Sequence, residues 1–330
     1  MSGGLLGTAS VDLHAALAEL RERGSAGEEQ LIALLEQAVT DTYRRAVPDD
    51  DTVEARVDVL TGHFELVRPR KDDPEAPPEH VEPPTSDFTR QAATAARAAV
   101  HGLIRDVEAE RVLREASARR GELVDTVVER QDGALVWLAA GQLPVLLPPE
   151  EQMPGERLSR GHHLKVVIVE ARRRGRDAVA VGSRSHPDLL RRLLEQEVPE
   201  LSSGQVLVRA MAREPGRRSK VAVEAAQPGI DPVGACIGPK GVRIRAVVSE
   251  LGEEQVQVIG WSEDDAVYVA NSLQPAAVRR VELDLDSRTA HVLVPANQLS
   301  LAIGRSGENA RLAARLTRWR IDIEGEGEAQ

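Results

Sequence analysis

Apolar residues in the first part of the chain follow a helical spacing and then an alternating one. Residues 11–23 and 27–46 are predicted helices, and Pro48 ends the second of them. Residues 53–60 alternate between apolar and polar side chains, and a Thr-Gly turn leads into a short partner strand at 64–67. The pattern predicts a helical, α+β head at the start of the chain.

A proline-rich segment separates this head from a long helix. Six prolines fall between Pro69 and Pro84. Because proline lacks the backbone donor that helices and central strands need, the segment is predicted to be a loop or linker. An Ala- and Arg-rich helix is then predicted from about Phe88 to Arg119, behind side chains that can cap it. Residues 1–118 are therefore expected to form one domain.

Beyond Gly121 the chain consists of short alternating segments with glycine or proline at the turns. Five strands are predicted, at 122–129, 134–139, 143–147, 164–171 and 177–182. Short strands at this density indicate a small β-barrel of the OB type, which we assign to residues 119–184.

From residue 185 helices and strands are mixed, and one arrangement occurs twice. Each copy has a helix, two strands, a glycine-containing loop, a second amphipathic helix and a last strand. The spacings differ between the copies, so the repeat is architectural. Residues 185–261 and 262–330 are expected to be two domains of one kind, and the chain as a whole is expected to be multidomain α+β.

The charge of the chain is distributed unevenly. The net charge is −11, and residues 1–118 carry 13 basic and 23 acidic side chains, so the rest of the chain is nearly neutral. Two interpretations of the acidic head stay open: it keeps the chain in solution, or it binds another protein. The remainder is neutral enough to bind RNA.

Targeting and redox signals are absent from the sequence. No apolar run reaches the ~18 residues that a membrane helix needs, and the N-terminus lacks the basic and apolar parts of a secretory signal. Cys236 is the only cysteine, so no disulfide can form within the chain. We expect a cytoplasmic protein with no membrane partner.

The sharpest motif is Ile-Gly-x-x-Gly, which occurs at residues 237–241 and again at 303–307. Each copy precedes an amphipathic helix, as does the G-x-x-G loop of a KH domain, which clamps about four nucleotides. Two glycines let the backbone approach a sugar-phosphate chain closely. The free N–H groups at the start of the following helix attract a phosphate. The sequence therefore predicts two KH domains in tandem that bind single-stranded RNA.

Basic residues accompany both loops. Lys240 and Arg305 place a cation at the same loop, and Arg311, Arg315 and Arg318 share one helix face. The expected RNA-binding residues lie in the loops, on nearby helices, in a basic hairpin and in the barrel: Gly238, Pro239, Lys240, Gly241, Arg243, Arg245, Gly304, Arg305, Ser306, Gly307, Arg311, Arg315, Arg213, Arg217, Arg218, Lys220, Lys165 and Arg184. The basic hairpin can equally be a solvated turn.

Other candidate chemistry is weak. Trp137 either stacks on a base or packs in the barrel core. His162 and His163 have no cysteine nearby, and a surface loop is favoured over a metal site. No phosphate-binding, nucleophile or zinc-protease motif is present. We expect no catalytic residue, no metal and no cofactor, and a protein that is not an enzyme.

The order of these parts resembles the NusA family of bacterial transcription termination and antitermination factors. The resemblance covers nearly the whole chain and rests on runs at 147–156, 183–187, 197–200, 212–216, 231–241 and 299–323. It implies a barrel of the S1 type and two type II KH domains. The excess of arginine over lysine is similar to that of actinobacterial members, and we expect the chain to lack the acidic C-terminal repeats of some others.

The resemblance also implies partners. Residues 1–118 would bind RNA polymerase at the flap of its β subunit. The barrel and both KH domains would bind nascent RNA, including antitermination sites in ribosomal RNA leaders. With other antitermination factors, the protein would modulate pausing, termination and antitermination, and we expect a monomer. A translation or ribosome-assembly protein built from the same RNA-binding modules stays open as an alternative.

The second KH loop departs from the family pattern. The family usually has a further glycine in this loop and a glutamine after it, whereas this chain has Glu308 there. A carboxylate favours the helix dipole but opposes a phosphate, so the second clamp is expected to be weaker. Arg318 replaces another usual glycine.

Overall fold

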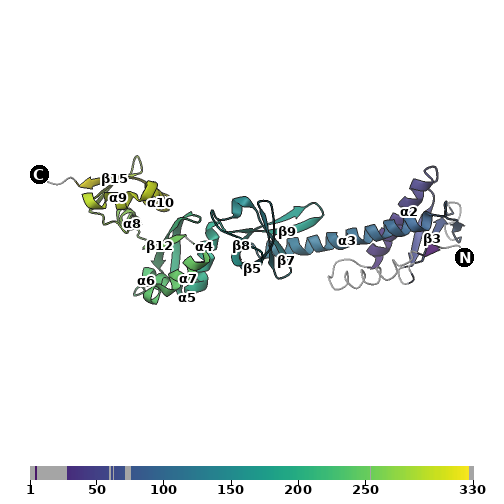
Figure 1. The fold of residues 1–330 in the computed structure, drawn as a ribbon, viewed down its shortest axis with the longest axis horizontal. Helices are drawn as coiled ribbons and strands as arrows, with labels where there is room; N and C mark the ends of the chain where they lie inside the picture. The colour runs from purple at the N-terminus through teal and green to yellow at the C-terminus, as the bar shows by residue number, and fades with distance from the viewer. Residues whose placement is uncertain are drawn as a thin grey trace. The chain divides into compact units, whose positions relative to one another are not determined.

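A computed structural model describes residues 4–5, 28–58, 61, 63–70, 76–252 and 254–326 (Figure 1). The helix predicted at 11–23 lies outside these residues. The chain divides into two units: residues 1–115 with 172–179, and residues 116–171 with 180–330. Among the described residues, no helix is long and apolar enough to cross a membrane.

In the described part of the first unit, two helices pack on a small sheet. Its elements are β1 (Gly4–Leu5), α2 (Glu28–Ala46), β2 (Glu54–Asp58), β3 (His63–Arg68), β4 (Glu79–Val81) and α3 (Phe88–Ala118), of which α3 continues into the second unit. Strand β3 pairs with β1, β2 and β4. Leu31 and Leu35 of α2 and Phe88 of α3 are fully buried against Phe64 of β3. The apolar stripe seen in the sequence thus faces the hairpin, because only this arrangement removes both from water.

Strand β4 is the one element here that the proline pattern concealed. Its residues lie between Pro78 and Pro83, where four consecutive positions keep their backbone donors. They pair with β3 in the register Leu66↔Val81. The segment predicted as a loop is therefore in part an edge strand.

The barrel is closed, as the short alternating strands predicted. Strands β5 (Leu123–Asp132), β6 (Leu135–Ala140), β7 (Leu143–Leu147), β8 (His163–Arg174) and β9 (Asp177–Ser183) form a ring in the order β5-β6-β7-β9-β8. Strands β7 and β9 are parallel, with Val145 opposite Ala180. A side chain at Gly182 would come within 2.8 Å of Val145, so the glycine permits close packing inside the ring.

The second unit continues with two domains of one topology (Figure 1). The first consists of α4 (Pro187–Glu197), α5 (Pro199–Ser202), β10 (Val206–Glu214), β11 (Arg218–Ala225), α6 (Pro232–Ile237), α7 (Val242–Glu250) and β12 (Gln255–Gly260). The second consists of α8 (Asp265–Ser272), β13 (Arg280–Asp284), β14 (Thr289–Pro295), α9 (Leu299–Ile303), α10 (Glu308–Thr317) and β15 (Arg320–Glu326).

Both sheets have an antiparallel pair followed by a parallel one. Strand β11 is antiparallel to β10 and parallel to β12, and β14 has the same relation to β13 and β15. The chain order helix-strand-strand-helix-helix-strand is that of the type II KH fold, so the multidomain α+β class is confirmed. Each domain has its own core, with Val221 and Val247 buried in the first and Val292 and Ala313 in the second.

A separate apolar cluster joins the two KH domains. Ala212, Ala222 and Ile259 on the first sheet contact side chains from α8 and α10. Within the second domain, the Tyr268 hydroxyl donates a hydrogen bond to the Leu316 carbonyl. Burial raises the pKa of Tyr268 to about 12, so this phenol stays a donor at all physiological pH values. The two KH domains are therefore in direct contact within one unit.

Candidate nucleic-acid interface

The two glycine loops have the same backbone shape. Gly238 has φ 71° and ψ 170°, and Gly304 has φ 76° and ψ 169°. Two residues later, Lys240 (φ 52°, ψ 25°) and Ser306 (φ 51°, ψ 29°) are both left-handed. A positive φ is the conformation that glycine adopts most readily, and Lys240 and Ser306 adopt it with a side chain present. The sequence motif thus corresponds to one repeated conformation.

The first glycine of each loop is required for two reasons. Its dihedral angles lie in a region that is essentially open to glycine alone. A Cβ would also lie 2.7 Å from the Arg243 side chain at Gly238, and 2.9 Å from the backbone nitrogen of Asn309 at Gly304. The loops can therefore close tightly onto the helix that follows each of them.

Exposed apolar side chains flank both loops. Ile237 and Val242 border the first loop and are 38% and 55% exposed, and Leu301 and Ile303 precede the second with 44% and 39%. Solvated isoleucine, leucine and valine beside a backbone clamp offer an apolar surface to nucleobases. Sequence reasoning stressed the cations and overlooked this surface, although Val242 and Leu301 are visible beside the motifs.

Three expected cations at the loops are exposed and without a carboxylate partner among the described residues: Lys240, Arg245 and Arg305. Arg245 instead donates a hydrogen bond to the carbonyl of Lys240. These side chains are placed to meet a phosphate at each loop.

Arg243 supports the first loop from beneath. Its guanidinium donates to Glu200 at 2.9 Å and to the carbonyl of Ala235 at 2.7 Å. The side chain is half-buried against Gly238. In the second domain the buried Asn309 packs against Gly304 and supports the loop in the same way. It donates to the carbonyls of Ala302 and Leu273 at 3.0 Å.

The arginines of α10 contact a carboxylate. Arg311 donates from Nε and Nη2 to Glu214 at 2.7 and 2.8 Å, and Arg315 donates to the same carboxylate at 3.3 Å. In the basic hairpin, Arg217 is exposed and Arg218 donates to Gln255. The hairpin therefore presents cations of its own, and through Glu214 it also neutralises the two arginines of α10.

Three expected RNA-binding residues are buried, which corrects the expectation for them. Arg184, Arg213 and Lys220 expose at most 9% of their surface, so no phosphate can reach their charged groups. The sequence pattern located these cations correctly in the chain. It could not show that each one is matched by partners inside the protein.

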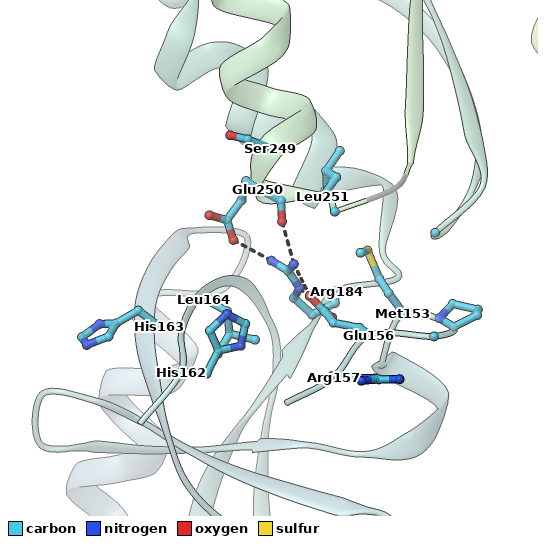
Figure 2. Close-up of a pocket in the computed structure, with 14 residues that line it drawn as sticks. Met153, Glu156, Arg157, His162, His163, Leu164, Arg184, Ser249, Glu250 and Leu251 are labelled. Atoms are coloured by element: carbon cyan, nitrogen blue, oxygen red, sulfur yellow. Dashed lines mark hydrogen bonds and ion pairs between the residues drawn. The ribbon is translucent and has the colours of Figure 1, made fainter. Parts of the chain in front are cut away.

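Arg184 links the barrel to the first KH domain (Figure 2). It forms ion pairs with Glu156 and Glu250 and donates to the carbonyls of Lys165 and Glu250. Lys165 is half-buried, and its ammonium donates to Asp125 at 2.6 Å. The buried charge of Arg184 is tolerated because each N–H group of its guanidinium donates to an acceptor.

Arg213 is held by the fully buried Glu254. Its Nε and Nη2 each donate to that carboxylate at 2.9 Å, and Ser219 and the backbone N–H of Gly216 complete the carboxylate's hydrogen bonds. Lys220 donates to the side chain of Gln257 and to the carbonyl of Gln274, and no carboxylate of the described residues forms an ion pair with it. Burial lowers the pKa of Lys220 to about 7.

A cavity of about 400 Å³ lies where the barrel meets the first KH domain. Figure 2 shows His162 and His163 on one side and the end of α7, Ser249 to Leu251, on the other. Both histidines are exposed; His162 lies in the loop that the sequence predicted, whereas His163 is the first residue of β8. Within the described residues no group of histidine, cysteine and carboxylate side chains is arranged to hold a metal ion.

The tryptophan left open by the sequence is half-buried. Trp137 lies in β6, and the Arg130 guanidinium lies 4.5 Å from its ring centre. An arginine thus covers one face of the ring, and core packing and stacking on a base both stay predictions for this side chain.

Comparisons with known proteins agree with this architecture. Family models described as the NusA-like first KH domain and the NusA-like second KH domain match residues 184–261 and 265–330. A transcription termination/antitermination protein NusA from Mycobacterium tuberculosis is 39% identical over 326 residues, which cover 96% of this chain and 94% of the relative. The same protein from Halalkalibacterium halodurans is 39% identical over 281 residues, covering 85% and 73%.

Proposed function

The chain belongs to the NusA family of transcription termination/antitermination proteins. We propose that it acts in termination and antitermination by binding RNA polymerase and the nascent transcript together. It is a transcription factor and not an enzyme. The observation that carries the RNA half of the proposal is the pair of glycine loops with one backbone shape, each opening a helix and flanked by exposed apolar side chains.

We assign the RNA contacts in order of accessibility. The loops at 238–241 and 304–307 come first, with the free cations Lys240, Arg245 and Arg305. Arg217 and Arg218 of the hairpin and Lys165 of the barrel extend the surface at its margins. The transcript is single-stranded where it is bound, because the loop clamps an unpaired backbone and leaves the bases free to contact apolar side chains.

The head supplies the contact to polymerase in this proposal. Residues 1–118 would bind near the flap of the β subunit, residues 119–184 form the S1-type barrel, and residues 185–261 and 262–330 form the KH domains. The acidic charge of the head supports a protein partner over RNA, because phosphates would be repelled. The protein would work in the cytoplasm as a monomer, alongside other antitermination factors at ribosomal RNA leaders, and without a cofactor.

A reconstituted transcription assay tests the proposal. Polymerase is stalled at a pause site followed by an intrinsic terminator, and the full chain is added. We expect longer pauses and a larger terminated fraction, and both effects should shrink when the central residues of the two loops are changed to Asp. Unchanged pause lifetimes with the native chain would contradict the proposal.

Residue-level crosslinking to the same paused complex separates the two halves. Crosslinks from residues 1–118 should reach polymerase, and crosslinks from both loops should reach RNA. Crosslinks from the loops to protein alone would assign them to another role.

A further inference from the structure

Glu214 ends β10 in the first KH domain, yet its partners are in the second. Its carboxylate is 13% exposed and accepts two hydrogen bonds from Arg311, 97 residues later in the chain, and one from Arg315. Hydrogen bonding from Arg311 holds the pKa of Glu214 below its usual value, so the group is ionised at neutral pH. Two parallel hydrogen bonds to one guanidinium define a direction as well as a distance.

Arg311 connects this carboxylate to the second glycine loop. Its remaining nitrogen, Nη1, donates to the carbonyl of Ser306 at 3.4 Å. Ser306 is the left-handed residue at the centre of that loop. A displacement of Glu214 would therefore be transmitted to the loop through a single side chain.

The hairpin that carries Glu214 is itself firmly held. Two residues after Glu214, the backbone N–H of Gly216 donates to the buried Glu254. Gly216 has φ 70°, and a Cβ there would lie 3.1 Å from the carbonyl oxygen of Pro154, next to the barrel. Glu214 thus projects from a turn that is fixed on the first KH domain.

The apolar contact between the KH domains does not fix an angle by itself. Ala212 and Ala222 present small side chains to Leu312 and Leu316, and such contacts are non-directional. Leu312 and Leu316 each follow one of the two arginines in α10, so the helix presents an apolar pair beside a basic pair. Directional contacts cross this interface at two places. Lys220 and Gln257 donate to the carbonyl of Gln274 and Asn271 donates to that of Gly260, whereas Glu214 is the ionised group that binds α10 beside the second loop.

We propose that Glu214 is a positioning residue, which sets the second KH loop in register with the first so that one RNA strand can occupy both. This inference rests on the proposed RNA-binding function of the loops. Arg311 and Arg315 act here through Glu214, and the phosphate contact of the second loop is left to Arg305. Loss of the carboxylate leaves each loop intact and loosens their shared register, since the contacts at Gln274 and Gly260 remain.

The geometric half of the inference is tested without RNA. Spin labels are placed in the full chain at Gln227→Cys and Leu285→Cys, two exposed positions in the two KH domains. The native Cys236 is buried, and burial raises its thiol pKa to about 11, so it reacts slowly with the label. We expect Glu214→Gln to broaden the distance distribution measured by pulsed electron resonance. The control Glu224→Gln removes an ion pair to Arg209 inside the first domain and should leave the distribution narrow.

The functional half compares two RNA lengths on the same variants. For Glu214→Gln we expect about a tenfold loss of affinity for a strand of about eight or more nucleotides, twice the site of one loop, and no change for a four-nucleotide strand. The inverted pair Glu214→Arg with Arg311→Glu should narrow the distance distribution again and restore part of the affinity for the longer strand.

Each other outcome overturns the inference in a distinct way. An unchanged distance distribution means that Glu214 positions nothing. Equal losses for both strands mean that it acts locally at one loop, and a gain for both means that it only competes with phosphate for the arginines. If the native chain binds neither strand, the proposed RNA-binding function fails, while the distance measurement still decides whether Glu214 sets the geometry.

Discussion

The two KH loops have one backbone conformation, but different side chains maintain it. In the first domain the half-buried Arg243, paired with Glu200, packs beneath Gly238. In the second domain the buried Asn309 takes this position under Gly304 and bonds only to backbone carbonyls. An ion-paired arginine and a neutral amide both support the same loop. The loop therefore requires a particular backbone conformation, and it does not require a particular side chain beneath it.

The loops differ more in what they present to a phosphate. The first helix begins with the exposed Val242, and the second begins with Glu308, whose carboxylate lies at the positive end of the α10 dipole. The expected weakness of the second clamp therefore stays a prediction that rests on this carboxylate. The experiments below separate the effect of backbone shape from the effect of charge.

The largest effect should come from charge reversal in the loops. Changing Pro239, Lys240, Arg305 and Ser306 together to Asp should weaken RNA binding at least about 100-fold, because four carboxylates would face the phosphates. The first-loop pair alone should cost more affinity than the second-loop pair. Fluorescence anisotropy measures the affinity, and circular dichroism checks that the fold is kept. Unchanged affinity in the fourfold variant would show that the loops do not clamp RNA.

Glycine substitutions should destabilise the second domain more than the first. Gly304→Ala forces a Cβ against a backbone nitrogen, and we expect it to cost about 3–4 kcal/mol of unfolding free energy. Gly238→Ala meets the bendable Arg243 side chain and should cost about 2–3 kcal/mol. Gly307→Ala, with open space around it, is the control at about 1 kcal/mol. Urea unfolding measures all three, and equal costs at 238 and 304 would refute the role given to the backbone contact.

Lys220 should make the first domain more stable at alkaline pH. Its folded pKa of about 7 lies below the value of 10.5 for an unfolded chain, so unfolding takes up a proton between these values. The part of the unfolding free energy that is linked to this titration is fully present above about pH 10.5, and it is lost as the pH falls through 7. From pH 7 to pH 9 the native chain should gain about 1–3 kcal/mol relative to Lys220→Met.

Urea unfolding at the two pH values measures this difference. Lys240→Met, which replaces an exposed lysine of the neighbouring loop, is the matched control. Equal changes in unfolding free energy between the two pH values, in the native chain and in Lys220→Met, would show that burial does not strain the ammonium.

The smallest effect concerns Glu308. Glu308→Gln should raise the affinity of the second loop for RNA about two- to fivefold, since it removes a like charge worth about 0.5–1 kcal/mol from the phosphate site. The binding is best measured with the first loop already disabled by Asp substitutions. A decrease in affinity would show that Glu308 is needed to hold the loop.

Much of this protein follows from the sequence alone, because the signals concerned are local. The alternating strands of the barrel, the helix-strand order of the KH domains and the two loop conformations depend on residues a few positions apart. Glycine at 238 and 304 is a direct consequence of dihedral angles that other residues avoid. The end of α10 is local as well, since Arg318 caps the helix in the left-handed conformation with φ 62°.

The tertiary structure alone decided which charges meet solvent. Arg184 and Arg213 look like their exposed neighbours in the sequence, but carboxylates 66 and 41 residues away enclose them. Glu214 lies among the basic residues of the hairpin in the sequence, and only folding brings Arg311, 97 residues later, beside it. Burial and ion pairing depend on groups that only folding brings together, so a local pattern can locate a cation in the chain but cannot assign it to RNA or to a buried carboxylate.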